Sequence, residues 1–387
     1  MNNLQKYSIV ILIILPLGCK KIGKSNSPEI QPKSDTLVSL ENDRVKLTYS
    51  LLGGALIEFQ DKKSLVNPFT WKMDAEDMPE NNKKGAVFQG HFLCSGRWGS
   101  PSAGEIKLGM PDNGESSNNW WKPEGKSTDL KLNMRCEALL DGLTINRSVV
   151  LSQKDPLIKV KETITNDLSI CRTTTVLQHA TIGPPFFDKN LIINTNATYG
   201  FNHSLISKGL NKYEYSWPTA IIDTLKIIPF DLTKSQKIQF ISSHIFNDSI
   251  SWVTASNPNL RLMLGYAWKR NDYPWFNLWN GVQKDKYWVK GLLFGTTGLG
   301  NKSSCDEHLT KTFHGVKNFE VIDAKESCSK YYYCFLITIP ENYEKTLKVT
   351  FENDITGHYT DVQRTKYHKR TCMRQYWAAA SHIRSSA

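Results

Sequence analysis

Apolar and polar residues alternate along most of the chain, which is the pattern of half-buried β-strands. The alternation is clear in DRVKLTYSLLGGALIEFQ, breaks at Gly53-Gly54, and returns in LKLNMRCEALLDGLTINRSVVLSQKDPLIKVKETITND. Asp141-Gly142 is a hairpin signal between two alternating runs, and Asp155-Pro156 marks a second turn. Strand patterns follow in CRTTTVLQHATI, LRLMLGYAWK, YYYCFLITIP and KTLKVTFEN. Many short strands separated by turns predict an all-β sandwich or barrel.

The alternating region contains no Pro/Ser-rich linker, no clear internal repeat and no long amphipathic helix pattern. We therefore predict a single antiparallel β domain over residues 37–355. After Gly357 the alternation is lost, and residues 356–387 are expected to form a basic tail that is disordered or contains a short helix.

The N-terminus follows a different pattern, MNNLQKYSIVILIILPLGC. Its apolar run from Ile9 to Leu17 is shorter than the roughly 20 residues that span a bilayer, and it is typical of a secretory signal. Gly18-Cys19 resembles a bacterial lipoprotein cleavage site, at which the cysteine becomes the lipid-modified N-terminus. We expect residues 1–19 to be a lipoprotein signal peptide and residues 20–36 a flexible tether. The domain would then be lipid-anchored in the bacterial cell envelope, periplasmic or surface-exposed; simple secretion is the alternative.

Composition and charge narrow the class of protein. The 387 residues are 40% hydrophobic and 22% charged, which is a globular composition. The net charge is +11, but about half of this excess lies in the predicted tail. Without a basic stripe, zinc-finger spacing or aromatic RNA motif, we predict no nucleic-acid partner. Eleven Trp residues supply flat apolar rings that can stack on sugars, although core packing accounts for most such residues.

Four segments concentrate polar and aromatic residues: GHFLCSGRWGSPS, GMPDNGESSNNWW, LQHATIGPPFFD and GYAWKRNDYPWFNLW. A fifth, WVKGLLFGTTGLG, misses the phosphate-loop spacing, and no G-x-S-x-G elbow is present. The spacing of Asp112, Glu115 and Asp272 is not diagnostic of a metal site, so we predict neither metal nor cofactor. The remaining candidates suit a carbohydrate, because buried hydroxyl groups need hydrogen-bond partners: Arg97, Glu115, His179, Trp268, Asp272 and Trp275.

These segments carry a family resemblance. LQHATIGPPFFD resembles the His-containing strand of galactose mutarotase-like (aldose 1-epimerase-like) proteins, and GYAWKRNDYPWFNLW resembles their later segment with Trp and Asp. NPFTWK, GHFLCSGRWGSPS and GMPDNGESSNN resemble a bacterial lipoprotein subgroup of the same superfamily. The resemblance spans about residues 40–355. It implies a large antiparallel β-supersandwich with an open, sugar-binding concave face.

The resemblance also implies a chemistry. In this superfamily a Glu removes the proton of the anomeric hydroxyl and a His protonates the ring oxygen, so that the ring opens and closes on its other face. His179 matches the acid, Arg97 matches an Arg that contacts sugar hydroxyls, and Asp272 matches an Asp that holds the sugar. Two positions depart from the pattern: Leu293 occupies the slot of the Glu, and Asn113 stands where related chains carry a His.

These departures favour a carbohydrate-binding, mutarotase-like envelope lipoprotein with weak or no epimerase activity, whose partner is a mono- or oligosaccharide. One alternative is an active aldose 1-epimerase-type isomerase with Glu115 as the base and His179 as the acid. Another is a non-enzymatic structural or interaction lipoprotein. If the protein is a carbohydrate-binding lipoprotein, we expect Asn113, Arg97 and Asp272 to hydrogen-bond the sugar and Trp268 and Trp275 to stack on it.

Overall fold

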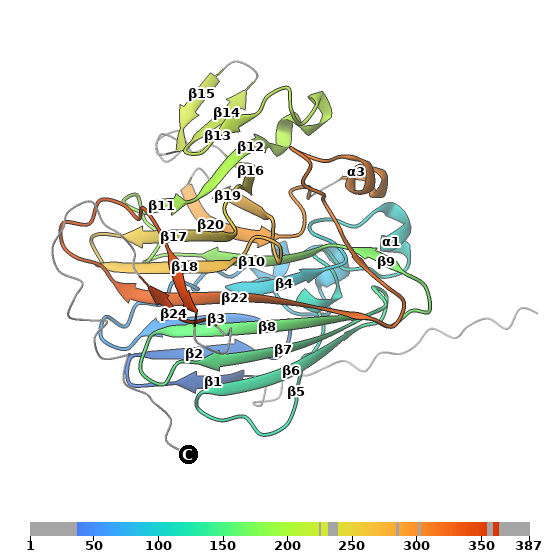
Figure 1. Cartoon of the computed structure of the whole chain (residues 1–387). Coiled ribbons are helices and arrows are strands. Elements are labelled where there is room, and N and C mark those ends of the chain that lie inside the picture. Colours follow the sequence, from blue (N-terminus) through green and yellow to red (C-terminus); the bar gives the residue numbers. More distant parts are fainter. Residues whose placement is uncertain are drawn as a thin grey trace, which may run out of the picture. The chain divides into compact units, whose positions relative to one another are not determined.

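The computed structural model describes residues 37–223, 226–230, 239–283, 286–300, 303–353 and 359–363, all within one compact unit. Two large antiparallel sheets dominate the fold (Figure 1). Cys19, the predicted signal peptide and the predicted tether lie outside the described residues. The fold class predicted from the alternating pattern is confirmed.

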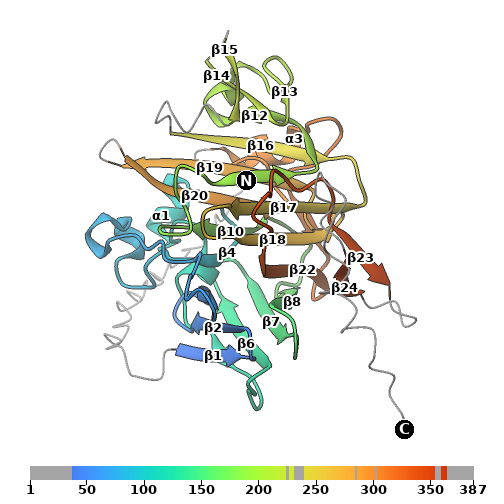
Figure 2. The ribbon, with the colours of Figure 1, turned by 90° about the vertical axis from the view of Figure 1, so that its left-hand side faces the viewer.

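The larger sheet has ten strands and contains the strand of His179. Its strands, in spatial order, are β1 (Leu37–Glu41), β2 (Val45–Ser50), β3 (Ala55–Asp61), β4 (His91–Ser95), β10 (Val176–Ile182), β20 (Lys286–Gly295), β19 (Trp275–Gln283), β16 (Phe240–Phe246), β12 (Ala197–Asn202) and β13 (Tyr215–Ser216). Figure 2 shows β1 and β2 at one end of this sheet and β12 and β13 at the other.

The second sheet has eight strands and covers one face of the first. Its strands, in spatial order, are β11 (Ile192–Thr195), β17 (Ile250–Asn257), β18 (Leu262–Lys269), β22 (Ser327–Thr338), β8 (Leu157–Asn166), β7 (Leu143–Leu151), β6 (Lys131–Ala138) and β5 (Lys122–Pro123). The main hydrophobic core lies between the sheets, where Leu93 and Phe294 of the larger sheet join Ile145 and Val160 of the smaller one.

The hairpins follow the sequence signals. β2 and β3 pair around the Gly53-Gly54 break, and β6 and β7 pair around Asp141-Gly142. Gly54 has φ +59, and a Cβ there would lie 2.4 Å from the Trp121 indole nitrogen, so only glycine fits. β7 and β8 pair across the second predicted turn.

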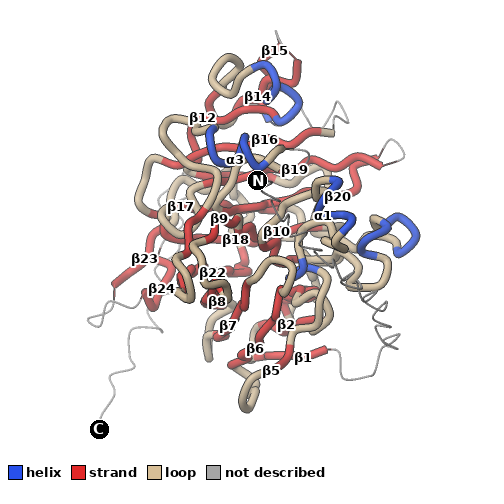
Figure 3. Tube along the Cα trace, turned by 90° about the vertical axis from the view of Figure 1, so that its right-hand side faces the viewer, coloured by secondary structure: helices blue, strands red, loops and turns tan. Residues whose placement is uncertain are grey.

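The remaining elements are small. Three two-stranded pairs are β14 (Thr219–Asp223) with β15 (Lys226–Pro229), β9 (Arg172–Thr174) with β21 (Glu320–Ile322), and β23 (Thr350–Asn353) with β24 (Tyr359–Gln363). The described helices are α1 (Ala103–Lys107), α3 (Cys305–Thr310) and the 3₁₀ turns η1 (Ala75–Asp77), η2 (Glu80–Asn82), η3 (Glu115–Ser117) and η4 (His203–Lys208). Figure 3 shows these helices as short segments outside the sheets.

Two findings concern the ends of the domain. β24 falls within the predicted tail and pairs with β23, so this part of the tail is a strand, and residues 364–387 lie outside the described residues. Within the described ranges, no helix has the length and hydropathy needed to cross a membrane.

Candidate functional site

The outer face of the ten-stranded sheet carries a second apolar cluster, separate from the core between the sheets. Side chains of adjacent strand residues point to opposite faces, so Leu93 joins the inter-sheet core while its neighbours Phe92 and Cys94 face outward. We call the outward-facing residues the outer aromatic cluster and define it by its aromatic members: Trp71, Phe88, Phe92, Trp98, Trp279 and Trp288.

His179 lies on this outer face in β10. It pairs with Phe92 of β4, and the two rings stack at 4.5 Å with an interplanar angle of 12°. Trp279 meets the imidazole edge-on at 5.7 Å. Nδ1 is 2.8 Å from Thr181 Oγ1, whereas Nε2 makes no hydrogen bond with a described residue. His179 therefore presents one free ring nitrogen beside an indole.

Burial controls the charge of this histidine. His179 is only 7% exposed, and burial lowers its pKa to about 3. The Thr181 hydroxyl also lies 3.4 Å from the His179 carbonyl oxygen, to which it can donate. Nδ1 then carries the imidazole proton and donates it to Thr181, and the free Nε2 is an acceptor.

Leu293 lies directly across from His179 on β20. Gln178 pairs with Phe294 on one side of this position, and Thr181 pairs with Gly291 on the other. Leu293 is fully buried in the outer aromatic cluster, and no described carboxylate is hydrogen-bonded to His179. On its far side Leu293 pairs with Asn277, whose amide is already bonded to Ser243 and to the Thr297 carbonyl. The position facing His179 thus lacks a group that could accept a proton.

Glu115 begins η3 and performs a structural task away from His179. One carboxylate oxygen accepts hydrogen bonds from the backbone N–H groups of Leu140 and Asp141 at 2.6 and 3.1 Å. The other accepts from the Asn119 amide at 3.3 Å. These contacts hold η3 against the β6–β7 hairpin turn. The structure does not bring Glu115 and His179 together.

Arg97 and Asn113 also bind the protein itself. Arg97 pairs with Glu105 of α1 at 2.5 Å, and Asn113 accepts a hydrogen bond from the Gly99 N–H at 2.8 Å while its own N–H donates to the Gly99 carbonyl. The Asn113 backbone has φ +65, a conformation that Asn adopts more readily than most residues. The two residues brace the loop between β4 and η3.

The three remaining candidates are engaged elsewhere. Asp272 accepts a hydrogen bond from the Tyr331 N–H, and burial raises the pKa of its carboxyl. Trp268 lies in the inter-sheet core, stacked on Phe294 at 4.2 Å. Trp275 is fully buried beside Leu299, and its indole N–H donates to the Lys317 carbonyl. Because both rings are covered, neither is available to stack on a sugar in this conformation.

The sequence did not predict a binding role for Trp71, Trp279 and Trp288. In the structure these three members of the outer aromatic cluster contact one another beside His179. Trp71 and Trp279 lie in segments that the sequence had marked, NPFTWK and GYAWKRNDYPWFNLW. A count of aromatic residues per segment was the available signal, but it does not tell which rings are covered.

Comparison with solved structures identifies the fold, although no family profile and no curated protein sequence matches the chain. A galactose mutarotase related enzyme of Lactobacillus acidophilus superposes with a TM-score of 0.56 at 10% identity, covering 78% of this chain and 97% of that one. A galactose mutarotase-like protein of Clostridium acetobutylicum gives 0.56 at 13% identity, with coverages of 78% and 95%. One from Lactobacillus casei gives 0.51 at 13% identity, with coverages of 78% and 100%.

The chain has the galactose mutarotase-like fold. At these identities the likeness establishes the architecture, and the residues of this chain decide what the site can do. The β-supersandwich that the resemblance implied is confirmed.

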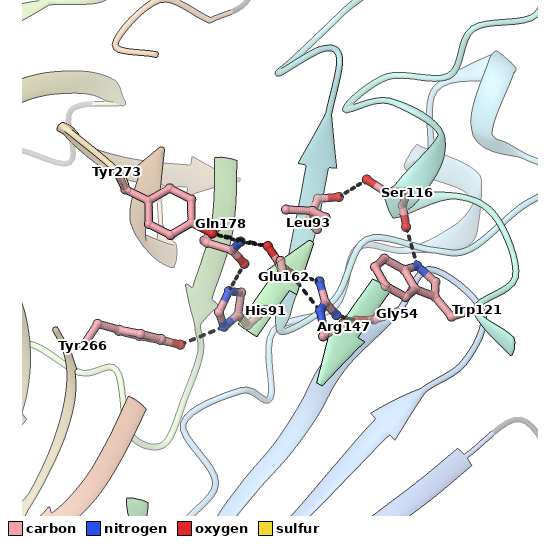
Figure 4. A network of polar contacts seen from close by, with 10 residues as sticks. All are labelled: Gly54, His91, Leu93, Ser116, Trp121, Arg147, Glu162, Gln178, Tyr266 and Tyr273. Carbon is pink, nitrogen blue, oxygen red and sulfur yellow. Dashed lines mark hydrogen bonds and ion pairs between the residues drawn. The ribbon is translucent and has the colours of Figure 1, made fainter. Parts of the chain in front are cut away.

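Directly behind His179, the mutarotase-like sandwich contains a chain of buried polar groups (Figure 4). Tyr266 and His91 Nδ1 are 3.0 Å apart, His91 Nε2 and Gln178 Oε1 are 3.1 Å apart, and Gln178 Nε2 donates to Glu162 at 2.5 Å. Since the Gln178 amide nitrogen donates to a carboxylate, its oxygen accepts from His91, and His91 accepts from Tyr266. Burial lowers the pKa of His91 to about 3, which keeps this donor order fixed.

The chain ends on a buried ion pair. Arg147 of β7 binds Glu162 of β8 at 2.7 Å, donates to the Gly54 carbonyl at 2.5 Å, and lies 4.3 Å from the centre of the Trp121 ring. The Trp121 indole N–H in turn donates to the Ser116 carbonyl, as Figure 4 shows. The network thus connects both sheets with the loop that contains η3.

Among the described residues, no group of three or more His, Cys, Asp or Glu side chains is placed to hold a metal ion.

Proposed function

We propose that this protein binds carbohydrate beside His179, on the outer face of the ten-stranded sheet, and interconverts sugar anomers weakly or not at all. The observation that carries the proposal is the pairing of His179 with Leu293: a neutral imidazole with one free nitrogen faces an aliphatic side chain. The mutarotase-like fold of the sugar-related structures supports the substrate class.

The hydrogen bonding of His179 supports binding over catalysis. An acid that protonates a ring oxygen needs a proton on its free nitrogen, and a pKa near neutrality makes such transfer efficient. His179 instead holds its proton toward Thr181, and burial lowers its pKa to about 3. Its Nε2 is suited to accept a hydrogen bond from a sugar hydroxyl, while the partly buried Trp279 supplies a flat apolar surface beside it.

The absence of a base at position 293 supports the same conclusion. A positioned general base contributes on the order of 10²–10⁴ to the rate of a proton-transfer reaction. Leu293 contributes nothing of this kind, and the carboxylate of Glu115 is occupied by three N–H donors.

Two measurements test the proposal together. Ligand-observed NMR and calorimetry with a panel of neutral aldoses should detect binding that weakens by about tenfold or more in His179→Ala. Saturation-exchange NMR on the anomeric protons should show no more interconversion than the buffer does. Because His179 stays neutral, the dissociation constant should be constant between about pH 5 and pH 8. Rapid anomer exchange by the wild type, or a panel without any binding, would refute the proposal.

We further propose that the domain is lipid-anchored in the bacterial cell envelope through Cys19. The support comes from the sequence, in which a short apolar run ends at Gly18-Cys19 and is followed by a polar stretch rich in Lys, Ser and Pro.

A further inference from the structure

The outer aromatic cluster extends beyond the surroundings of His179. Six hydrophobic residues of this face are only partly buried: Ile57, Met73, Val87, Ile241, Trp279 and Trp288. Exposed apolar side chains that gather in one place indicate a binding surface, whereas scattered ones do not. Two of these six are tryptophans, and both lie on the β19–β20 hairpin.

A β-bulge turns Trp288 onto this face. Gly281 pairs with Val289 and Val282 pairs with Tyr287, so Trp288 has no partner and is the extra residue of β20. Regular alternation would place Trp288 on the face opposite to Val289, but both side chains pack in the outer aromatic cluster. Bulges often re-aim a side chain next to a functional site.

The bulge brings Trp288 to two other indoles. Its ring is 5.4 Å from that of Trp71 and 6.5 Å from that of Trp279, and Trp279 in turn contacts His179. The Trp71 and Trp279 rings are perpendicular, at 90° and 5.9 Å. His179, Trp279 and Trp288 thus follow one another in contact along the outer face.

Trp71 adds an unmet polar group. It is 4% exposed, and its indole N–H is buried without a hydrogen-bond partner among the described residues. A buried donor of this kind costs free energy unless a partner reaches it. The Trp288 ring is in edge contact with that of Trp71, so a hydroxyl group of a ligand bound against Trp288 could supply that partner once the Trp71 ring moves.

We propose that Trp71, Trp279 and Trp288 form a second sugar subsite beside His179, so that the ligand is an oligosaccharide rather than a single monosaccharide. This inference rests on the proposed function. His179 accepts a hydroxyl of one unit, and the partly buried rings of Trp279 and Trp288 stack on the next, while the buried Trp71 contributes its indole N–H. Stacking is tolerant of the identity of the sugar because every pyranose has an apolar face, so the stacking rings set preferred chain length more than sugar type.

The test is a length series on the purified full-length protein. Binding of cello-, malto- and galacto-oligosaccharides, from monosaccharide to hexasaccharide, is measured by calorimetry for the wild type and for Trp288→Ala, Trp288→Phe and Trp120→Ala. Trp120 is a half-buried tryptophan that packs against the inter-sheet core and serves as the matched control.

The wild type should bind the trisaccharide of at least one series about tenfold more tightly than its monosaccharide. Trp288→Ala should abolish most of this gain and leave monosaccharide affinity within about twofold of wild type. Trp288→Phe should retain most of the gain, and Trp120→Ala should change neither value.

Each other outcome counts against the inference in a distinguishable way. Monosaccharide binding without dependence on chain length overturns the second subsite but leaves the proposed function intact. An equal loss of affinity for all lengths in Trp288→Ala and Trp288→Phe shows a structural role only. Failure of every sugar to bind removes the proposed function and the subsite together.

Discussion

At the residue scale, neighbours decide what each polar side chain can do. His179 and Glu115 are both buried acid–base groups, but they differ in what surrounds them. The imidazole keeps one free nitrogen beside aromatic rings, whereas the carboxylate is filled by backbone and amide N–H donors. A carboxylate bonded in this way maintains a turn rather than exchanging protons with a ligand.

Introducing a carboxylate across from His179 should give the protein measurable anomer-exchange activity. We expect Leu293→Glu to raise anomer exchange at least about 10²-fold above Leu293→Gln, because it provides a base and a charge that favours the imidazolium. Saturation-exchange NMR compares the two variants, and near-ultraviolet circular dichroism confirms that both are folded. Equal rates in two folded variants would mean that Leu293 is not what prevents catalysis.

A second residue-scale prediction concerns Asp141 in the β6–β7 turn. Burial, followed by the nearby Glu115 charge, raises the pKa of Asp141 from 3.8 to about 7. Because the folded-state pKa lies above the unfolded one, stability from this group is complete below about pH 4 and is lost as the pH rises through 7. Between about pH 5 and pH 8 the wild type should therefore lose about 2–3 kcal/mol relative to Asp141→Asn.

Urea unfolding at several pH values measures this difference, and Asp323→Asn, at an exposed position, is the control that should follow the wild type. Parallel pH profiles for wild type and Asp141→Asn would contradict the raised pKa.

At the element scale, buried polar contacts fix how the strands around the site are held. β4 and β10 present Phe92 and His179 to the outer face and His91 and Gln178 to the inner one. The inner pair is bonded to Tyr266 of β18 and Glu162 of β8 in the second sheet. The ring stack at the site is therefore supported from behind by contacts that cross the sandwich.

The ion pair at the end of this network should show strong coupling. Arg147→Met or Glu162→Met alone leaves a buried charge without its partner, which typically costs about 3–5 kcal/mol. The double variant should lose about 1–3 kcal/mol less than the two single losses combined. Urea unfolding of all four proteins gives the coupling energy, and simple additivity would show that the two groups act independently.

At the scale of the whole molecule, two antiparallel sheets enclose one core and leave the outer face of the larger sheet to carry a second apolar cluster. The outer face, with His179 and three tryptophans, can bind the proposed carbohydrate ligand only in a compartment that contains it. The proposed envelope anchor would hold it within reach of extracytoplasmic sugars.

The anchor can be tested on cells expressing the full chain. Wild-type protein should incorporate a fatty-acid label and enter the detergent phase on Triton X-114 partitioning. Cys19→Ser should lose the label, while Cys171→Ser, at an exposed position of the domain, should keep it. A label that persists in Cys19→Ser would refute anchoring at this residue.

Much of the fold was predictable from local sequence. Alternation and turn residues located β2, β3, β6, β7 and β8. In a strand with one solvent-exposed face, successive side chains are alternately buried and exposed, so polar and apolar residues alternate in the sequence. The family resemblance placed Leu293 in the slot of the Glu, and the strand register, which was not predicted, places this residue across from His179.

The site itself was decided by tertiary structure. Every residue of β10 is buried, so the alternation disappears in the strand that carries His179 and cannot tell its two faces apart. The bulge at Trp288 reverses the face that alternation predicts, and the contacts that occupy Glu115, Asp272 and Trp268 come from distant segments. The sequence determined which strands form. Only the packing of the two sheets determined which side chains are covered, because coverage depends on residues far apart along the chain.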